Sequence, residues 1–304
     1  MLSTRLLFGF SMVGALLLVL CLDEWFAPWF PTWFVLALLV MGASARELVA
    51  LLANTPLKPT ASTVFSSVIL LVLANWAPHI TRHVLSTVQR GWALPHDPLG
   101  PIDHLGWAFM TFAALIMLVL LLESFRAHPP GQTIVAVAGS ILAISYLGVL
   151  GTFIIQHRWL DGPYHGIFPL AYLVATSKGS DTGAYTVGRM AGRHKLWPRV
   201  SPNKTIEGAI GGVAFGILAA LITAAVTRYV FGTFTFSWGH AALFGFLVSI
   251  TAQLGDLMES LIKRDCARKD ASAVVPGFGG VLDVIDSLLF AAPVSFAFWL
   301  TLGT

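Results

Sequence analysis

Long apolar stretches recur along almost the whole chain, and they restrict its fold more than any other feature. A helix that spans a membrane needs about 17–25 mostly apolar residues. Nine segments meet or approach this length, at 6–22, 25–41, 61–80, 105–122, 133–155, 166–177, 208–231, 239–254 and 287–302. A backbone in lipid must satisfy its own hydrogen bonds, so these segments predict helices. We therefore expect an all-α, polytopic integral membrane bundle of about nine transmembrane helices.

The low content of charged residues supports this interpretation and excludes several classes of protein. Charged residues make up 11% of the chain and hydrophobic residues 56%, whereas a typical soluble domain is about 25% charged. Such a chain has too few charges to cover a soluble globular surface. We therefore exclude a soluble enzyme, a disordered protein and a conventional DNA-binding domain, and we expect no nucleic-acid partner.

The basic residues predict both the orientation and the division of labour along the chain. With a cytoplasmic N-terminus, nine crossings place 14 of the 18 Lys and Arg residues on the cytoplasmic side, as the positive-inside rule requires. All charged residues of the last 129 positions lie between Lys178 and Asp286. We expect residues 1–165 to form a scaffold of transmembrane helices. Residues 166–304 should form the catalytic region, with its polar site facing the cytoplasm.

Two polar clusters stand out early in the second half. The first runs from Ser177 to Tyr185 and contains Asp181. The second runs from Arg199 to Gly208 and directly precedes an apolar span, so Lys204, Thr205 and free backbone N–H groups can gather at a helix N-terminus. Such a terminus attracts phosphate. The alternatives are a helix cap or turn for the first cluster and a helix start without a ligand for the second.

A third cluster, from Gln253 to Asp286, carries most of the chemical information. Asp256, Glu259 and Lys263 share one helical face, and Asp283 and Asp286 share another. A carboxylate at the end of a span is costly unless it is paired or metal-bound, so Asp256 is a functional candidate. Acids that hold Mg²⁺ beside bases that hold phosphate fit this segment. The plainer alternatives are a positive-inside loop, a tight glycine turn and a helix cap.

These clusters closely resemble the motifs of one enzyme family, the phosphatidate cytidylyltransferases, also called CDP-diacylglycerol synthases. The resemblance rests on SLIKR at 260–264, KD at 269–270 and PGFGGVLDVID at 276–286. Three further segments match in the family's order: DTGAY at 181–185, SPNKTIEG at 201–208 and QLGDLMES at 253–260. The resemblance covers residues from about 177 to 290, while the first half matches only as a set of apolar spans.

The resemblance implies a nucleotidyltransferase of phospholipid biosynthesis. It would condense CTP with phosphatidic acid to give CDP-diacylglycerol and pyrophosphate, in the inner or plasma membrane of the cell and with its active site on the cytoplasmic side. Mg²⁺ is the expected cofactor, with K⁺ as the candidate for a second cation nearby. The other expected partners are membrane lipids and a second copy of the chain in a homodimer.

The resemblance also suggests a role for individual residues. Asp256 and Asp283 would hold Mg²⁺ and, with Lys204 and Lys263, would form the catalytic group. The residues expected at phosphates or at the nucleotide also include Ser201, Thr205, Arg264, Lys269, Asp270, Asp181, Gly279 and Gly280. Because the lipid phosphate is already ionised near neutral pH, no general base is required, which agrees with the lack of a Ser-His or Cys-His motif.

Two positions depart from the family pattern, and other functions stay open. Phe278 stands where the family commonly has His, and Val284 stands where it commonly has Arg, which leaves details of substrate contact open. A CDP-alcohol phosphotransferase would need two Asp four apart after a glycine, but Asp283 and Asp286 are three apart. The remaining alternatives are a polyprenyl-phosphate sugar transferase, an ion-coupled transporter and a structural membrane subunit. Basic residues gathered at one face argue against a transporter.

Overall fold

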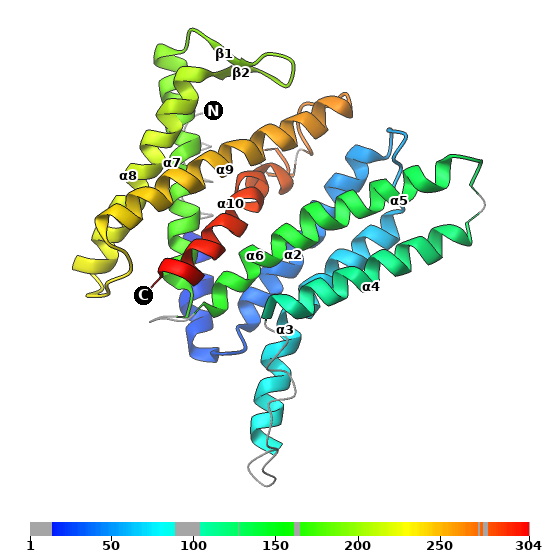
Figure 1. Ribbon diagram of the computed structural model, residues 1–304, viewed down its shortest axis with the longest axis horizontal. Coiled ribbons are helices and arrows are strands. Elements are labelled where there is room, and N and C mark those ends of the chain that lie inside the picture. Colours follow the sequence, from blue (N-terminus) through cyan, green and yellow to red (C-terminus); the bar gives the residue numbers. More distant parts are fainter. Residues whose placement is uncertain are drawn as a thin grey trace. The chain divides into compact units, whose positions relative to one another are not determined.

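The computed structural model (Figure 1) describes residues 14–88, 104–126, 128–160, 165–272, 274–275 and 279–303. The chain divides into two compact units, Met1–Gln156 and His157–Thr304. Both are built almost entirely of helices. The expectation of an all-α helical protein is therefore confirmed.

The first unit is a set of helices around an apolar core. Residues 14–23 are helical. The elements that follow are η1 (Glu24–Phe26), α2 (Pro31–Leu52), α3 (Ala61–Val88), α4 (His104–Ser124), α5 (Gln132–Ala143), the π-helical turn η3 (Ile144–Val149) and α6 (Leu150–Gln156). One buried hydrophobic cluster of this unit consists of Leu71, Leu115, Val119, Val137 and Ile144.

The backbone N–H groups at the start of α2 are capped by a side chain that precedes the helix in sequence. Phe30 occupies the N-cap position and offers no capping side chain. Instead, the buried carboxylate of Asp23 accepts the backbone N–H groups of Thr32 and Trp33, both at 2.9 Å. Pro31 has no N–H to satisfy at this end. The first turn of α2 is thereby capped inside an apolar environment.

The second unit contains four long helices and a small hairpin. Its elements are η4 (His157–Trp159), α7 (Ile167–Ala191), β1 (Lys195–Trp197), β2 (Ser201–Thr205), α8 (Ile206–Tyr229), α9 (Trp238–Asp265) and α10 (Leu282–Leu302). The strands pair antiparallel, with Lys195 opposite Thr205 and Trp197 opposite Ser201. The hairpin connects α7 to α8 and lies at one end of both helices (Figure 1).

Small residues and aromatic residues hold the second unit together in different places. Where α7 meets α8, a Cβ on Gly183 would lie 2.4 Å from the Phe215 side chain, so only glycine permits this approach. The end of the unit distant from the hairpin is filled by an aromatic core of Tyr172, Phe236, Phe244, Phe298 and Trp299. The close approach of α7 and α8 brings the polar segments of both helices to the same end.

Seven helical segments within the described residues are long and apolar enough to cross a membrane. They are Pro31–Leu52, Ala61–Thr81, Leu105–Ser124, Gln132–Trp159, Ile206–Tyr229, Trp238–Asp265 and Leu282–Leu302. Each overlaps one of the nine predicted spans. Of the other two, 6–22 lies partly outside the described residues, and 166–177 forms the first half of α7, which also carries charged residues. The chain is thus an integral membrane protein.

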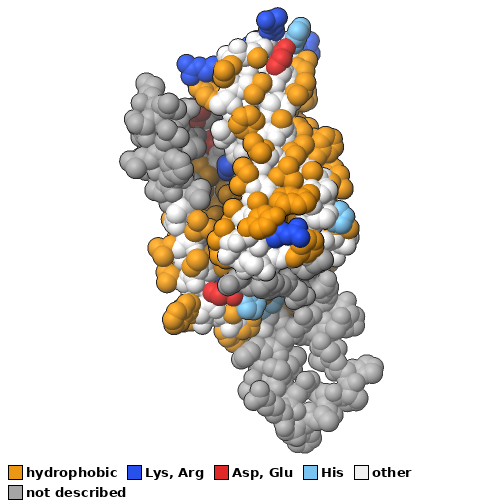
Figure 2. All heavy atoms as spheres, turned by 90° about the vertical axis from the view of Figure 1, so that its left-hand side faces the viewer, with side chains coloured by type: hydrophobic (Ala, Val, Ile, Leu, Met, Phe, Trp, Pro, Cys, Tyr) orange, Lys and Arg blue, Asp and Glu red, His pale blue; other side chains and the backbone are white. Residues whose placement is uncertain are grey.

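The surface of the second unit agrees with this placement. On the face shown in Figure 2, hydrophobic side chains cover a long continuous stretch of the described surface. Lys and Arg side chains gather at the upper end, which is the end where β1 and β2 lie in Figure 1. This division between an apolar wall and a basic end is typical of a membrane protein that meets water at the hairpin.

Candidate active site

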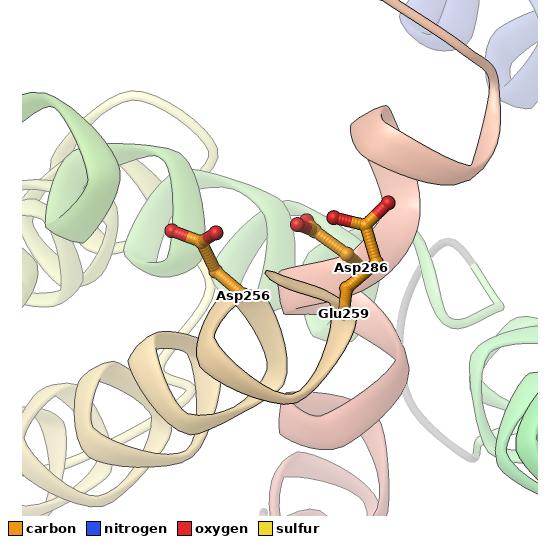
Figure 3. Close-up of side chains that lie close together, drawn as sticks. All are labelled: Asp256, Glu259 and Asp286. Carbon is orange, nitrogen blue, oxygen red and sulfur yellow. The ribbon is translucent and has the colours of Figure 1, made fainter. Parts of the chain in front are cut away.

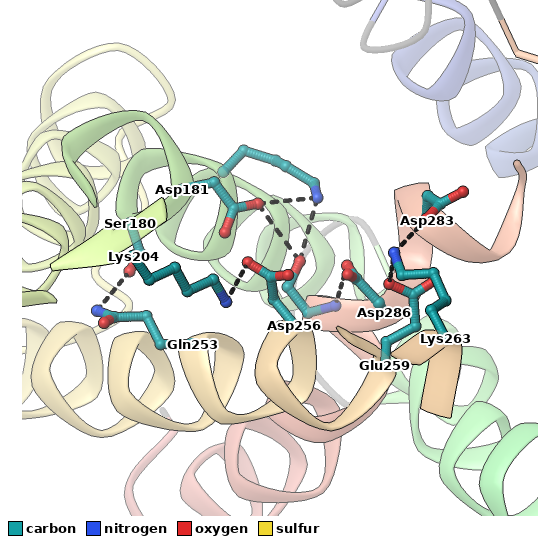
Figure 4. Close-up of polar contacts among 11 residues, drawn as sticks. Ser180, Asp181, Lys204, Gln253, Asp256, Glu259, Lys263, Asp283 and Asp286 are labelled. Carbon is teal, nitrogen blue, oxygen red and sulfur yellow. Dashed lines mark hydrogen bonds and ion pairs between the residues drawn. The ribbon is translucent and has the colours of Figure 1, made fainter. Parts of the chain in front are cut away.

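Charged side chains from three helices and one strand meet near the hairpin end of the second unit. We call them the charged cluster. Its members are Lys178, Asp181, Lys204, Asp256, Glu259, Lys263, Asp283 and Asp286. Figure 4 shows most of them as a row of acids and bases that runs along α9, from Lys204 to Lys263. They come from α7, β2, α9 and α10, so the fold collects residues that are up to 108 positions apart.

Ion pairs organise the two ends of the charged cluster. At one end, the Nζ atom of Lys204 lies 2.7 Å from Oδ2 of Asp256. At the other end, Lys263 forms ion pairs with both Glu259 and Asp283, and its Nζ lies 2.5 Å from Oδ1 of Asp283. The side chain of Asp256 is 37% exposed, whereas that of Glu259 is 1% exposed. The Lys204 end is therefore the one that water and solutes reach.

Three carboxylates in the middle of the charged cluster are arranged to hold a cation. One oxygen each from Asp256, Glu259 and Asp286 lies within 4.8 Å of the other two (Figure 3). Glu259 and Asp286 are buried. Clustered acids in an apolar setting are costly unless positive charge compensates them. This carboxylate triplet consists only of oxygen ligands, which hard divalent cations prefer.

A glycine on α9 makes the carboxylate triplet possible. A Cβ on Gly255 would lie 2.6 Å from the backbone oxygen of Asp286 and 3.0 Å from Cβ of Phe290. Only glycine allows α9 and α10 to approach this closely. Because Asp256 follows Gly255 directly, the contact sets Asp256 beside Asp286. Glu259 then lies one helical turn further along the same face.

Asp283 has a different environment from Asp286, although both lie on the first turns of α10. Its Oδ2 accepts the backbone N–H groups of Gly280 at 2.6 Å and Ala271 at 3.1 Å. Gly279 has a φ of +105° and bonds to Val275 through both of its backbone groups. A side chain there would also collide with Asp283, at 2.6 Å. Asp283 thus fastens the loop before α10 as well as binding Lys263.

Lys178 and Asp181 bring α7 into the charged cluster. The Nζ atom of Lys178 donates to Oδ2 of Asp181 at 3.1 Å, to the backbone oxygen of Val284 at 3.0 Å and to Oγ of Ser287 at 3.1 Å. Ser287 in turn donates to Asp181 at 3.4 Å. Val284, where the resemblance led us to expect Arg, therefore contributes through its backbone.

The hairpin is fixed to the helices on both sides. The side chain of Thr205 caps α8 by accepting the N–H of Gly208 at 3.1 Å. Glu207, in the first turn of α8, accepts the backbone N–H groups of Arg193 and His194 before β1. Arg264, near the end of α9, donates to the backbone oxygen of Val200 at 3.4 Å. These contacts hold β2, and with it Lys204, over the carboxylate triplet.

An apolar groove adjoins the exposed end of the charged cluster. It has a volume of about 390 Å³ and lies between the hairpin, α8 and α9. Its walls are formed by Leu196, Trp197, Ala209, Ile210, Val213, Ile250, Gln253, Leu254 and Leu257. Gln253 is the polar member of this lining, and it donates to Ser180 on α7 at 3.2 Å. Asp256 lies one turn beyond Gln253 on α9, so the groove lies beside the charged cluster.

The structure brings some of the predicted site residues together and separates others. Lys204 meets Asp256, Lys263 meets Asp283, and Asp181 joins them through Lys178. Ser201 lies at the start of β2, and Lys269 and Asp270 are exposed on the segment after α9. Phe278 lies outside the described residues. The phosphate-binding roles assigned to Ser201, Thr205, Arg264, Lys269 and Asp270 stay predictions.

The composition of the carboxylate group differs from the predicted metal pair. The expected pair is Asp256 and Asp283, whereas the triplet joins Asp256 to Glu259 and Asp286. The metal role of Asp256 and Asp283 stays a prediction. Helical spacing placed Glu259 on the face of Asp256, and Asp286 on the face of Asp283. Helical spacing could not show that Asp283 would accept the backbone N–H groups of Gly280 and Ala271. Lys178 belongs to the first polar cluster but received no role, and Ser287 was missed, because nothing in the local sequence indicates that α7 and α10 meet there.

Comparison with known proteins identifies the family of the chain. The profile of the cytidylyltransferase family matches residues 3–302. The chain belongs to the cytidylyltransferase family. The match extends over both units, so the first half of the chain is part of the family's architecture and not an unrelated addition.

Individual relatives cover different shares of the chain. A phosphatidate cytidylyltransferase of Staphylococcus saprophyticus is 34% identical over 64% of this chain and 72% of its own length. The enzyme of the same name from Haemophilus influenzae is 43% identical over 46% of this chain and 48% of its own length. The uncharacterized protein YnbB of Escherichia coli strain K12 is 32% identical over 78% of both chains. The matched region thus ranges from about half to three quarters of each relative.

Proposed function

We propose that this chain is a membrane phosphatidate cytidylyltransferase, which converts CTP and phosphatidic acid into CDP-diacylglycerol and pyrophosphate. The observation that carries the proposal is the carboxylate triplet, with a lysine at each end, beside an apolar groove. The family membership supports it, as do relatives that bear this enzyme name. A charged site beside an apolar groove suits a reaction between a polyphosphate and a lipid.

The reaction joins two anions, so its difficulty is electrostatic. An oxygen of the lipid phosphate forms a bond to the α-phosphorus of CTP while the bond from that phosphorus to the α,β-bridging oxygen breaks. Pyrophosphate leaves with the electron pair of the broken bond. The nucleophile is already ionised, so the site needs no general base. What it needs is alignment of the reacting groups and compensation of their charge.

Lys204 is suited to receive a substrate phosphate. Its side chain is 26% exposed, and its only ion pair among the described residues is with Asp256. Its position on β2 places it over the exposed end of the charged cluster. An incoming phosphate can therefore replace Asp256 as its partner without exposing a buried charge. Lys263 is held between two carboxylates, so we assign it to keeping the buried end of the cluster compensated.

The carboxylate triplet fits Mg²⁺, and Asp256, Glu259 and Asp286 would hold it. When bound, this cation would withdraw charge from the phosphate oxygens. Asp283 contributes by ordering the adjacent loop. A second cation such as K⁺ fits the neighbouring oxygens less well than Mg²⁺ fits the triplet. The oxygens next to the triplet, from Asp181, Val284 and Ser287, already accept the ammonium group of Lys178.

We assign the apolar groove to an acyl chain of the lipid substrate. Ile210 and Leu254 in its wall are exposed on the apolar surface of the unit, so a chain can enter from the side. Gln253 and Asp256 lead from the groove to the carboxylate triplet along α9. A phosphate bound by Lys204 and a chain in the groove would thus belong to the same lipid molecule.

The wider setting follows the same proposal. We place the N-terminus and the active site on the cytoplasmic side of the cell membrane, because the basic end of the second unit follows the positive-inside rule. The seven candidate spans, α7 and the helical residues 14–23 support a total of about nine spans. We expect a homodimer and no nucleic-acid partner. Reporter fusions at each loop and the mass of the purified assembly test these points.

The decisive experiment combines cytidine-labelled CTP with phosphatidic acid and the purified protein in detergent. We expect label in a lipid product and an equal amount of released pyrophosphate, with Mg²⁺ present and not with EDTA. An R189M variant is the matched control, because Arg189 is exposed and its side chain donates to Tyr185 at the surface, away from the charged cluster. Folded protein that releases no pyrophosphate would overturn the proposal and favour a transporter.

A further inference from the structure

All hydrogen-bond donors of the Lys178 ammonium group have partners within the protein, although its side chain is 37% exposed. Its three N–H donors meet three oxygens at 3.0–3.1 Å, one each from a carboxylate, a backbone carbonyl and a hydroxyl. These acceptors come from two helices: Asp181 lies on α7, while Val284 and Ser287 lie on α10. All three hydrogen-bonding positions of the ammonium are therefore used. A lysine that served only to bind substrate would keep a donor free.

This set of oxygens is also the type that binds a monovalent cation. Carbonyl, hydroxyl and carboxylate oxygens replace the water of a weakly hydrated ion such as K⁺. Here the position is taken by a cation that is covalently part of the chain. Figure 4 shows the contacts around Asp181, which lie immediately above the carboxylate triplet. Lys178 also interacts electrostatically with Asp286 and Asp256.

The formal charge of the charged cluster, counted over the described residues, also gives Lys178 the role of a monovalent cation. The charged cluster contains five carboxylates and three ammonium groups, which leaves a charge of −2. One divalent cation compensates that charge fully. Without Lys178 the balance would be −3, and one divalent cation would leave a negative site facing two anionic substrates.

We propose that Lys178 is the built-in monovalent cation of this site, so that the protein works without K⁺ or another diffusible monovalent ion. Lys178 is a positioning residue: it holds Asp181 and the first turns of α10 against the carboxylate triplet. The activity measurements below rest on the proposed function, whereas the stability measurements do not.

The test compares wild type with a K178M variant at fixed Mg²⁺ and equal ionic strength. The monovalent salt is KCl, NH₄Cl or choline chloride. For wild type we expect the same turnover in all three salts, within about twofold. For K178M in choline chloride we expect a loss of about 100-fold. K⁺ or NH₄⁺ should restore part of that activity, because either ion can enter the vacated oxygen cage. R189M, which removes a basic residue from the same helix, should behave as wild type.

Thermal unfolding in detergent provides a second readout that needs no enzymatic activity. We expect KCl to stabilise K178M relative to choline chloride, and to leave wild type and R189M unchanged. A wild-type protein that needs K⁺ for turnover would overturn the inference, even if K178M failed to fold. So would a folded K178M whose stability does not respond to K⁺. If no protein made labelled lipid, the cytidylyltransferase proposal would fail while the unfolding data still decided the role of Lys178.

Discussion

Both units bury an acidic side chain among apolar helices, but they balance its charge differently. In the first unit, buried Glu123 forms an ion pair with Arg126 and lies 2.7 Å from Nε2 of His128, and Thr60 donates to it at 3.2 Å. Arg126 and His128 both lie within five residues of it in sequence. In the second unit, the acids and bases of the charged cluster come from four elements and have a formal charge of −2. The first arrangement balances the acid locally, whereas we propose that the second is balanced by a bound divalent cation.

The largest expected effect comes from neutralising a member of the carboxylate triplet. D256N or D286N should reduce formation of labelled lipid by about 1,000-fold or more, because each removes a charged ligand of the expected cation. In EDTA, the melting temperature of either variant should equal or exceed that of the wild type, because fewer negative charges lie close together. The stabilisation that Mg²⁺ gives the wild type should disappear. Turnover and unfolding with and without Mg²⁺ measure these effects.

The matched control in the first unit is E123Q. It also neutralises a buried acid, but its effect on turnover should be small and Mg²⁺ should still stabilise the protein. Near-wild-type turnover of D256N and D286N would remove the triplet from the reaction. Loss of the Mg²⁺ response in E123Q would show that the two units do not differ in the way described.

A smaller effect is expected where the backbone positions the triplet. G255A should reduce turnover by about 10- to 100-fold, because its Cβ would separate Asp256 from Asp286 by pushing α9 away from α10. In the first unit, G42A is the counterpart. Its Cβ would meet the Phe65 ring at 3.4 Å, an ordinary contact, so we expect near-normal turnover. Equal turnover of the two variants would contradict a positioning role for Gly255.

The smallest effect concerns the stability of the first unit. E123Q leaves Arg126 and His128 without a charged partner, and both of these are partly exposed. We expect the free energy of unfolding to fall by about 1–3 kcal/mol. Denaturant-induced unfolding in detergent measures this change. An unchanged free energy of unfolding would mean that the contacts of Glu123 with Thr60, Arg126 and His128 do not stabilise the first unit.

The sequence predicted the helical class and the order of the motifs because both depend on local patterns. Runs of apolar residues defined the spans, and helical spacing placed Asp256, Glu259 and Lys263 on one face. The small hairpin was not predicted: residues 201–205 form strand β2, and only Ile206 begins the helix. That outcome depends on pairing with residues 195–197, which no local pattern indicates.

Which carboxylates would face each other could not be read from the sequence. Asp283 and Asp286 lie about one helical turn apart on α10, and both have apolar neighbours in the sequence. The choice between them depends on backbone N–H groups of Gly280 and Ala271, which bind Asp283. The place of Lys178 depends on the packing of α7 against α10. These are tertiary contacts between segments about 100 residues apart.

The hairpin carries two surfaces on one short segment. Leu196 and Trp197 on β1 line the apolar groove, and Lys204 on β2 contacts Asp256. Because the strands are hydrogen-bonded to each other, neither surface can shift without the other. A lipid whose chain fills the groove poorly would therefore also misplace its phosphate. Discrimination between acyl chains should then appear in kcat and not only in KM.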